Sequence, residues 1–180
     1  MPVPTAYVLV VPVPERVAKA RAEGVSVVTL ARGISIDLAQ AAPWQLLGAK
    51  TLSYATNMAA LRFAHRMGAD DVIFTSTKNG VLPGVTQRAL FTEAKKAGWE
   101  CRYAPLFTAD LLTCDSIWML SSVTLAARVN SLDGLRMSAP DNAEEIIELV
   151  DRGVQRAHSR AAPTSRTAEN RWSSVGCRAS

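Results

Sequence analysis

Short aliphatic and β-branched runs recur along this chain, separated by amphipathic segments that do not alternate with them strictly. Runs of this length and composition predict β-strands at about residues 6–11, 25–30, 71–75, 100–104 and 116–121, with a further candidate at 125–130. Strict alternation of strands and helices would favour a doubly wound parallel sheet, so the irregular order predicts an α+β fold class.

Apolar residues spaced by three and four positions predict helices between these strands. The first helix ends at Gly68 and carries an apolar stripe formed by Leu52, Ala55, Ala59, Phe63 and Met67. A second helix is predicted from about residue 84 to a stop at Gly98, and a third over about residues 142–156. Between them, a short capped turn of helix is predicted at residues 108–112.

Length and composition fit one globular domain. A chain of 180 residues with 48% hydrophobic and 20% charged residues can bury a sizeable core. Its apolar runs are much shorter than the ~20 residues that cross a bilayer. The run at 7–11 has no basic region before it, so we expect neither a signal peptide nor a membrane partner.

Positive charge is concentrated near the C-terminus. The net charge is +4, and most of it comes from Arg160, Arg166, Arg171 and Arg178. Residues 158–180 show no apolar periodicity, so we expect a disordered tail after a domain at 1–157. A nucleic-acid-binding domain would depend on net charge alone, because the remainder has no basic face interleaved with aromatics, and we expect no nucleic-acid partner.

The cysteines are Cys101, Cys114 and Cys177, an odd number at wide spacing. This pattern fits neither a disulfide framework nor a zinc site, so no metal is expected. A reducing cytoplasm is the simplest compartment.

Lys50 is the leading candidate for a reactive side chain. The nine residues before it, 41–49, are uncharged, so its amine is expected to meet a poorly hydrated pocket, which lowers its pKa and frees a nucleophile suited to Schiff-base chemistry. The alternative is a solvated surface lysine. Tyr54 would lie near Lys50 if the helix began at residue 51 or 52, but it could equally be an interfacial tyrosine with its hydroxyl in water.

Two polar turns could bind an anion. Pro83 and Gly84 turn the chain so that the first N–H groups of the next helix, at Val85 and Thr86, point outward with the Thr86 hydroxyl. The alternative for Thr86 is a simple helix cap. Residues 121–124 end a strand with three hydroxyls in four residues, which could bind phosphate or a carboxylate, or form an ordinary turn.

Several segments, in the same order, make residues 6–137 resemble the class IV aminotransferase family of pyridoxal 5'-phosphate enzymes (fold type IV). They are residues 48–54, 58–61 with 68–74, 80–86, 118–122 and 132–134. The nearest members are aminodeoxychorismate lyases and branched-chain aminotransferase-like proteins. The resemblance implies the larger, C-terminal, cofactor-binding domain of a D-amino acid aminotransferase-like enzyme, in a family that usually forms homodimers.

The resemblance also implies residue roles. Lys50 would be the catalytic lysine that binds pyridoxal 5'-phosphate covalently, and Tyr54 would contact the cofactor's ring oxygen. Val85, Thr86 and Ser122 would hold its phosphate. Val123 and Thr124 would lie where the carboxylate of a small, amino-acid-like substrate docks.

Two family features are missing. The glutamate motif that pairs with the pyridine nitrogen should follow the strand at 71–75, but residues 75–80 lead directly to Val81. The arginine that a small N-terminal domain gives to the phosphate has no counterpart either. The implied function is an aminodeoxychorismate lyase-like reaction that releases pyruvate and forms 4-aminobenzoate, a folate precursor. The alternatives are an aminotransferase acting on branched-chain or D-amino acids, and a truncated relative without activity.

Overall fold

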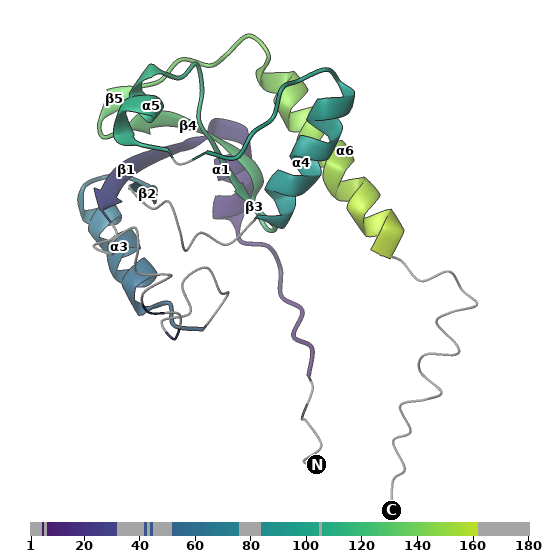
Figure 1. Cartoon of the computed structure of the whole chain (residues 1–180). Helices are drawn as coiled ribbons and strands as arrows, with labels where there is room; N and C mark the ends of the chain where they lie inside the picture. The colour runs from purple at the N-terminus through teal and green to yellow at the C-terminus, as the bar shows by residue number, and fades with distance from the viewer. Residues whose placement is uncertain are drawn as a thin grey trace, which may run out of the picture.

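The computed structural model describes residues 5, 7–31, 42, 44, 52–75, 84–104 and 106–161 of the chain. It is a mixed structure, which confirms the α+β prediction (Figure 1). The helices are α1 (Glu15–Glu23), α3 (Ala55–Arg66), α4 (Val85–Lys96), α5 (Thr108–Thr113) and α6 (Ala143–Ala161). The strands are β1 (Val25–Ala31), β2 (Asp71–Thr75), β3 (Trp118–Ser121), β4 (Leu125–Leu132) and β5 (Leu135–Arg136).

The strands form one mixed sheet in the order β2-β1-β4-β3, with β5 pairing to β4. β1 is parallel to both of its neighbours, β2 and β4, whereas β3 and β4 form an antiparallel hairpin. Val27, Val129 and Leu132 are each 1% exposed and form the core together with Leu111 of α5 and neighbouring apolar residues. Burial of these aliphatic side chains is the main force that holds the sheet to its helices.

Two aspartates fix β1 to the connections on either side of it. Asp70 Oδ2 accepts hydrogen bonds from the N–H of Ser26 at 2.8 Å and from its hydroxyl at 2.7 Å. Asp133 accepts from the N–H and the hydroxyl of Thr29, each at 2.7 Å. Because carboxylates accept strong hydrogen bonds, these contacts set the register at which the turns before β2 and after β4 meet β1.

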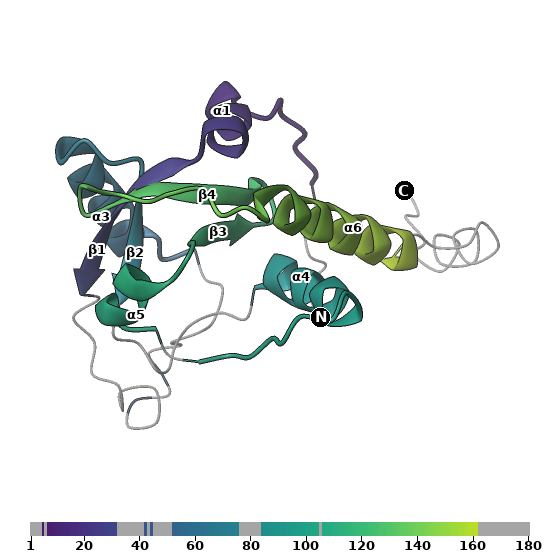
Figure 2. The same ribbon diagram turned by 90° about the horizontal axis from the view of Figure 1, so that it is seen from above.

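Helices α4 and α6 lie side by side at one end of the molecule (Figures 1 and 2). Gly153 permits their close approach, since a Cβ there would lie 2.7 Å from the Ala89 carbonyl oxygen. Buried Glu93 of α4 binds Lys96 on its own helix at 2.6 Å and Arg156 of α6 at 3.0 Å. The Lys96 hydrogen bond, followed by the charges of Arg156 and Lys96, holds the pKa of Glu93 below its ordinary value.

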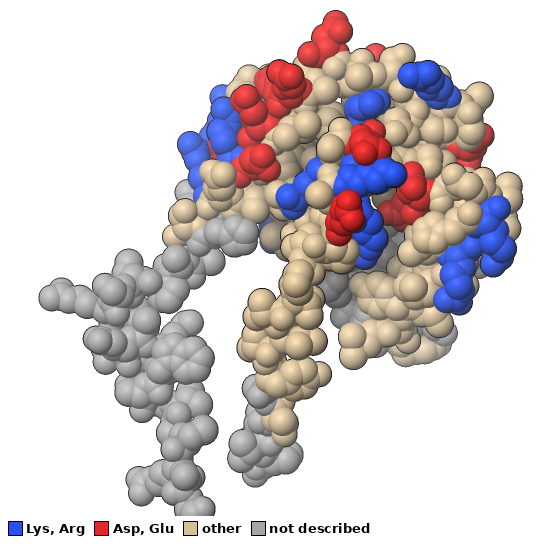
Figure 3. All heavy atoms as spheres, turned by 180° about the vertical axis from the view of Figure 1, so that it is seen from behind, with Lys and Arg blue, Asp and Glu red and all other residues tan. Residues whose placement is uncertain are grey.

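The predicted strand at 6–11 is wrong over its described residues. Residues 7–14 are extended but belong to no strand, and Tyr7 to Val11 are all well exposed. Figure 3 shows this arm as a column without acidic or basic side chains. A strand needs a neighbour for its backbone N–H and C=O groups, and the described residues provide none.

The predicted strand at 100–104 is also wrong. This segment is irregular, because the Tyr103 ring packs on Phe91 of α4, with ring centroids 5.0 Å apart, instead of joining the sheet. Helix α1, in contrast, was not predicted. It carries recognisable signals: Pro14 before its first turn, Glu15 within that turn, Arg21 in the last turn and Gly24 after it.

The apolar stripe predicted for α3 does not face the core of the described structure. Its buried residues are Ala60 and Ala64, whereas Leu52, Phe63 and Met67 are exposed. Only the small side chains allow the helix to approach the sheet closely. Helix α6 extends to Ala161, into the first residues of the segment expected to be a tail, and residues 162–180 lie outside the described residues.

Candidate functional site

Two of the predicted anion-binding segments converge. The N-terminal end of α4 lies beside the carboxyl end of β3, where the chain turns into β4 (Figures 1 and 2). Val85 and Thr86 come from the first element, and Ser122, Val123 and Thr124 come from the second. The two segments that carry these residues therefore belong to neighbouring elements.

The first turn of α4 has donors to offer. Gly84 precedes the helix with an extended backbone, no side chain caps the turn, and none of its residues is acidic. Thr86 is buried at 5% exposure, while Val85 is 59% exposed. The opening N–H groups of a helix have no partner within it and attract anions, so this end can bind a phosphate.

The β3–β4 turn is held from within by Ser121. Its pairing with Leu125 closes the hairpin, and Ser121 Oγ accepts hydrogen bonds from the N–H groups of Val123 at 3.3 Å and Thr124 at 2.8 Å. Leu125 ends the turn at a φ of 62°, a left-handed conformation that costs a non-glycine residue roughly 1–2 kcal/mol. Three-residue hairpin loops commonly end in this way.

The same turn is held from outside by Arg21 of α1. Its Nε donates to the Thr124 carbonyl oxygen and its second terminal nitrogen to that of Val123, both at 2.7 Å. Arg21 was not among the residues predicted to contribute to the site. A basic residue in a last helical turn is normally explained by the helix dipole, and nothing local indicates a partner more than a hundred positions away.

These contacts change the expectation for substrate binding. The N–H groups of Val123 and Thr124 are already engaged by Ser121, so in this state they are not free to bind a carboxylate. Ser122 is exposed and makes no hydrogen bond to any described residue. Within the described turn, Ser122 is therefore the residue best placed to accept a ligand.

An open groove of about 810 Å³ lies next to this turn, between α1, α3 and the sheet. Ser121 and Thr124 line it on one side, and Met58, Leu61 and His65 of α3 line another. Asp70 is also in its wall, where the hydrogen bond from the Ser26 N–H holds the pKa of that carboxyl below its ordinary value. Asp70 is therefore ionised at neutral pH and serves the fold.

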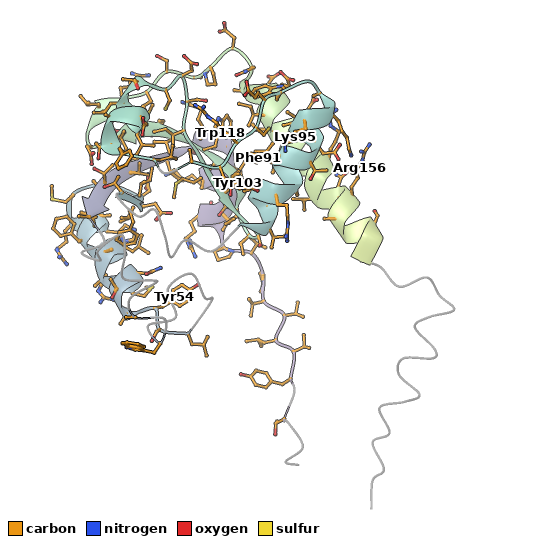
Figure 4. All side chains as sticks on the ribbon, viewed as in Figure 1. Tyr54, Phe91, Lys95, Tyr103, Trp118 and Arg156 are labelled. Carbon is orange, nitrogen blue, oxygen red and sulfur yellow. The ribbon has the colours of Figure 1, made fainter. Side chains whose placement is uncertain are left out.

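The other two predicted site residues are Lys50 and Tyr54. Lys50 lies outside the described residues. Tyr54 precedes the first residue of α3, which begins at Ala55 and not at 51 or 52, and its side chain is 45% exposed. Figure 4 places Tyr54 at the far side of the molecule from Phe91, Tyr103 and Trp118, which gather beside α4.

None of the described helices combines the length and the apolar composition that a membrane-spanning helix needs. The acidic and basic side chains on the face seen in Figure 3 are intermixed. This surface therefore has no single-signed stripe of the kind that tracks nucleic-acid phosphates.

Comparison with known proteins places these segments in a family context. The family model described as "Amino-transferase class IV" matches residues 2–81 and 75–132. A bifunctional aminodeoxychorismate lyase / D-amino acid transaminase of Mycobacterium tuberculosis is 45% identical over 183 residues, covering 84% of this chain and 63% of its own length. A solved hypothetical aminotransferase from M. tuberculosis, in its α-ketoglutarate- and PMP-bound form, superposes with a TM-score of 0.77 at 45% identity, covering 81% of this chain and 60% of that chain. Its PLP-bound form gives a TM-score of 0.76 at 45% identity, over 79% and 59% of the two chains.

The chain spans about three fifths of the length of these relatives. The family match is split into two pieces that overlap at residues 75–81. The alignment with the bifunctional relative is also longer than the part of this chain that it contains. Both observations agree with an internal segment of the family that is missing after β2, where the glutamate motif was expected.

Proposed function

Since this chain belongs to the class IV amino-transferase family, we propose that it is a pyridoxal 5'-phosphate protein of the aminodeoxychorismate lyase or aminotransferase type. The observation that carries the proposal is the junction of the α4 N-terminus with the β3–β4 turn. Both elements fall in the matched segments, and both present neutral donors suited to a phosphate.

The residues at this junction fit the cofactor. The first turn of α4 has no side-chain cap and no acidic residue that would compete with an anion. We assign the phosphate to the Val85 and Thr86 N–H groups, the Thr86 hydroxyl and Ser122. When bound, pyridoxal phosphate supplies an electron sink for negative charge that develops on the substrate's α-carbon.

Lys50 is the residue proposed to anchor the cofactor and to carry a proton to and from the substrate. Its uncharged approach, residues 41–49, favours a neutral amine, which can accept a proton. The phenol of Tyr54 would orient the cofactor ring. Val123 and Thr124 remain the proposed substrate side of the turn, with the Thr124 hydroxyl as the donor there, because their N–H groups are already bonded.

The reaction proposed first is the lyase reaction, which releases pyruvate and leaves 4-aminobenzoate, because the bifunctional relative is described as such a lyase. Transamination of D-amino acids has the same support, since that relative is also described as a D-amino acid transaminase. Branched-chain substrates remain an alternative.

A second candidate is a relative that binds cofactor weakly or not at all and has no turnover. The split family match at residues 75–81 favours it, because the glutamate motif expected to pair with the pyridine nitrogen does not follow β2 in the sequence. A homodimer and a cytoplasmic location are further expectations for the protein.

A cofactor titration followed by two assays separates these possibilities. Pyridoxal phosphate is titrated into the purified chain. Pyruvate release from aminodeoxychorismate and amino transfer from a D-amino acid to α-ketoglutarate are then measured. Binding with one of the two activities supports an enzyme of that type, and binding without either supports the non-catalytic relative. Failure to bind the cofactor contradicts the proposal.

A further inference from the structure

We propose that Arg21 is a positioning residue that fixes the β3–β4 turn, and thereby presents Ser122 to the cofactor's phosphate. This inference rests on the proposed function, because it concerns the same site. Arg21 itself contacts only the back of the turn.

The guanidinium group holds two successive carbonyl oxygens at once. Nε and a terminal nitrogen donate to Thr124 and Val123 at 2.7 Å each. Charge-assisted hydrogen bonds of this kind are short, and the planar fork of an arginine fixes both acceptors in one orientation. A lysine would supply a single point charge without that fork.

Both the carbonyl groups and the N–H groups of the turn are therefore hydrogen-bonded. Arg21 occupies its carbonyl groups, while Ser121 Oγ occupies the N–H groups of Val123 and Thr124. Leu125 ends the turn at a left-handed φ of 62°, the conformation in which three-residue hairpin loops commonly end. The arrangement leaves Ser122 as the outward-facing polar residue of the turn.

The charge of Arg21 is not cancelled by an acid. Among the described residues it forms no ion pair, whereas Lys19 on the same helix lies 3.9 Å from Glu23. A guanidinium bonded to carbonyl oxygens keeps its positive charge, and here that charge lies just behind the turn proposed to bind a phosphate. The contact can therefore favour an anion both by geometry and by its field.

Two variants and one matched control test the role. Arg21→Gln removes the fork and its charge, Arg21→Lys keeps the charge, and Lys19→Gln removes a charge from the same helix without touching the turn. Amide hydrogen exchange at Val123 and Thr124 is measured on the full chain without cofactor, with the β1 amides as internal reference. Pyridoxal phosphate is then titrated into each variant.

We expect exchange at Val123 and Thr124 to become about tenfold faster in Arg21→Gln, the factor that ~1.4 kcal/mol represents. Arg21→Lys should be intermediate, and Lys19→Gln and the β1 amides should not change. Affinity for pyridoxal phosphate should fall in the same order, by several-fold in Arg21→Gln.

Unchanged exchange in Arg21→Gln overturns the proposal, whatever the cofactor does. Faster exchange with unchanged affinity overturns the link to the phosphate. If the unmodified chain binds no pyridoxal phosphate, the proposed function fails separately, and the exchange measurement still decides the role of Arg21 in the turn. Should Arg21→Gln unfold, which a melting curve detects, Arg21→Lys against Lys19→Gln gives the same comparison.

Discussion

Replacement of Gly24 by alanine should destabilise the chain much more than the same change at Gly98. Gly24 joins α1 to β1 at a φ of 82° and a ψ of −172°. A Cβ at this position would lie 2.5 Å from the Arg128 carbonyl oxygen and 3.3 Å from Asn130 Nδ2. Gly98 follows α4 at a similar φ of 89°, but a Cβ there would meet nothing within 4 Å. Gly24 therefore combines a backbone conformation suited to glycine with a steric overlap that Gly98 lacks.

The expected magnitudes follow from these two terms. A positive φ costs an L-residue roughly 1–2 kcal/mol at Gly98, and the φ of 82° and ψ of −172° at Gly24, a combination that is essentially restricted to glycine, costs roughly 1–3 kcal/mol. At Gly24 the added methyl also meets a backbone oxygen of β4, which is held between β1 and β3 and cannot rotate away. Overpacking of this kind adds about 1–3 kcal/mol. Gly24→Ala should therefore lose about 2–6 kcal/mol, and Gly98→Ala only about 1–2 kcal/mol.

Thermal melting of the two variants measures the difference. For a chain of this size, 1 kcal/mol shifts Tm by about 2–4 °C, so Gly24→Ala should melt well below Gly98→Ala. Urea titration should give the same order. Equal losses in the two variants would show that β4 does not approach the α1–β1 connection closely, which contradicts the predicted overlap at Gly24.

Three further outcomes are expected. Asp70→Asn should lose about 1 kcal/mol at neutral pH. The pKa of Asp70 is lowered in the folded state, so its contribution to stability is complete above the ordinary aspartate pKa and is lost as pH falls through the folded-state pKa. The melting temperatures of wild type and variant should therefore converge below about pH 4. A constant difference between them down to low pH would contradict this. Glu93→Gln should lower Tm more than Glu145→Gln, since Glu93 is buried and joins α4 to Arg156; equal effects in parallel melting curves would count against that ion pair. Thr86→Ala should weaken pyridoxal phosphate binding by up to about tenfold, while Thr92→Ala, whose hydroxyl only donates to the Arg88 carbonyl on the same helix, should leave the titration unchanged.

Local sequence patterns predicted the strands whose aliphatic residues pack in the central sheet. The runs at 25–30 and 71–75 became β1 and β2, because their aliphatic residues pack in a sheet with partners on both sides of β1. The run at 6–11 has similar composition, yet no described residue pairs with it. Composition alone cannot say whether a partner strand exists.

The site shows the same limit. The helix opening at Val85 and the hydroxyl-rich turn at 121–124 were visible in sequence, because capping and turn chemistry are local. Their proximity in the fold could not be derived from their spacing in the sequence. The same holds for the two hydrogen bonds from Arg21 to the turn, which link residues more than a hundred positions apart. Such contacts depend on how the sheet places α1 beside the β3–β4 hairpin.

The most direct test of the account is to map where pyridoxal phosphate attaches. The chain is incubated with the cofactor, reduced with borohydride and analysed by peptide mass spectrometry, with Lys50→Ala treated in parallel. We expect one adduct, at Lys50, and its loss in Lys50→Ala, because Lys95 and Lys96 lie in the last turn of α4, away from the opening of the helix proposed to bind the phosphate, and Lys96 is paired with Glu93 at 2.6 Å. An adduct of equal yield at Lys19, Lys78, Lys95 or Lys96, or one that persists in Lys50→Ala, would contradict it.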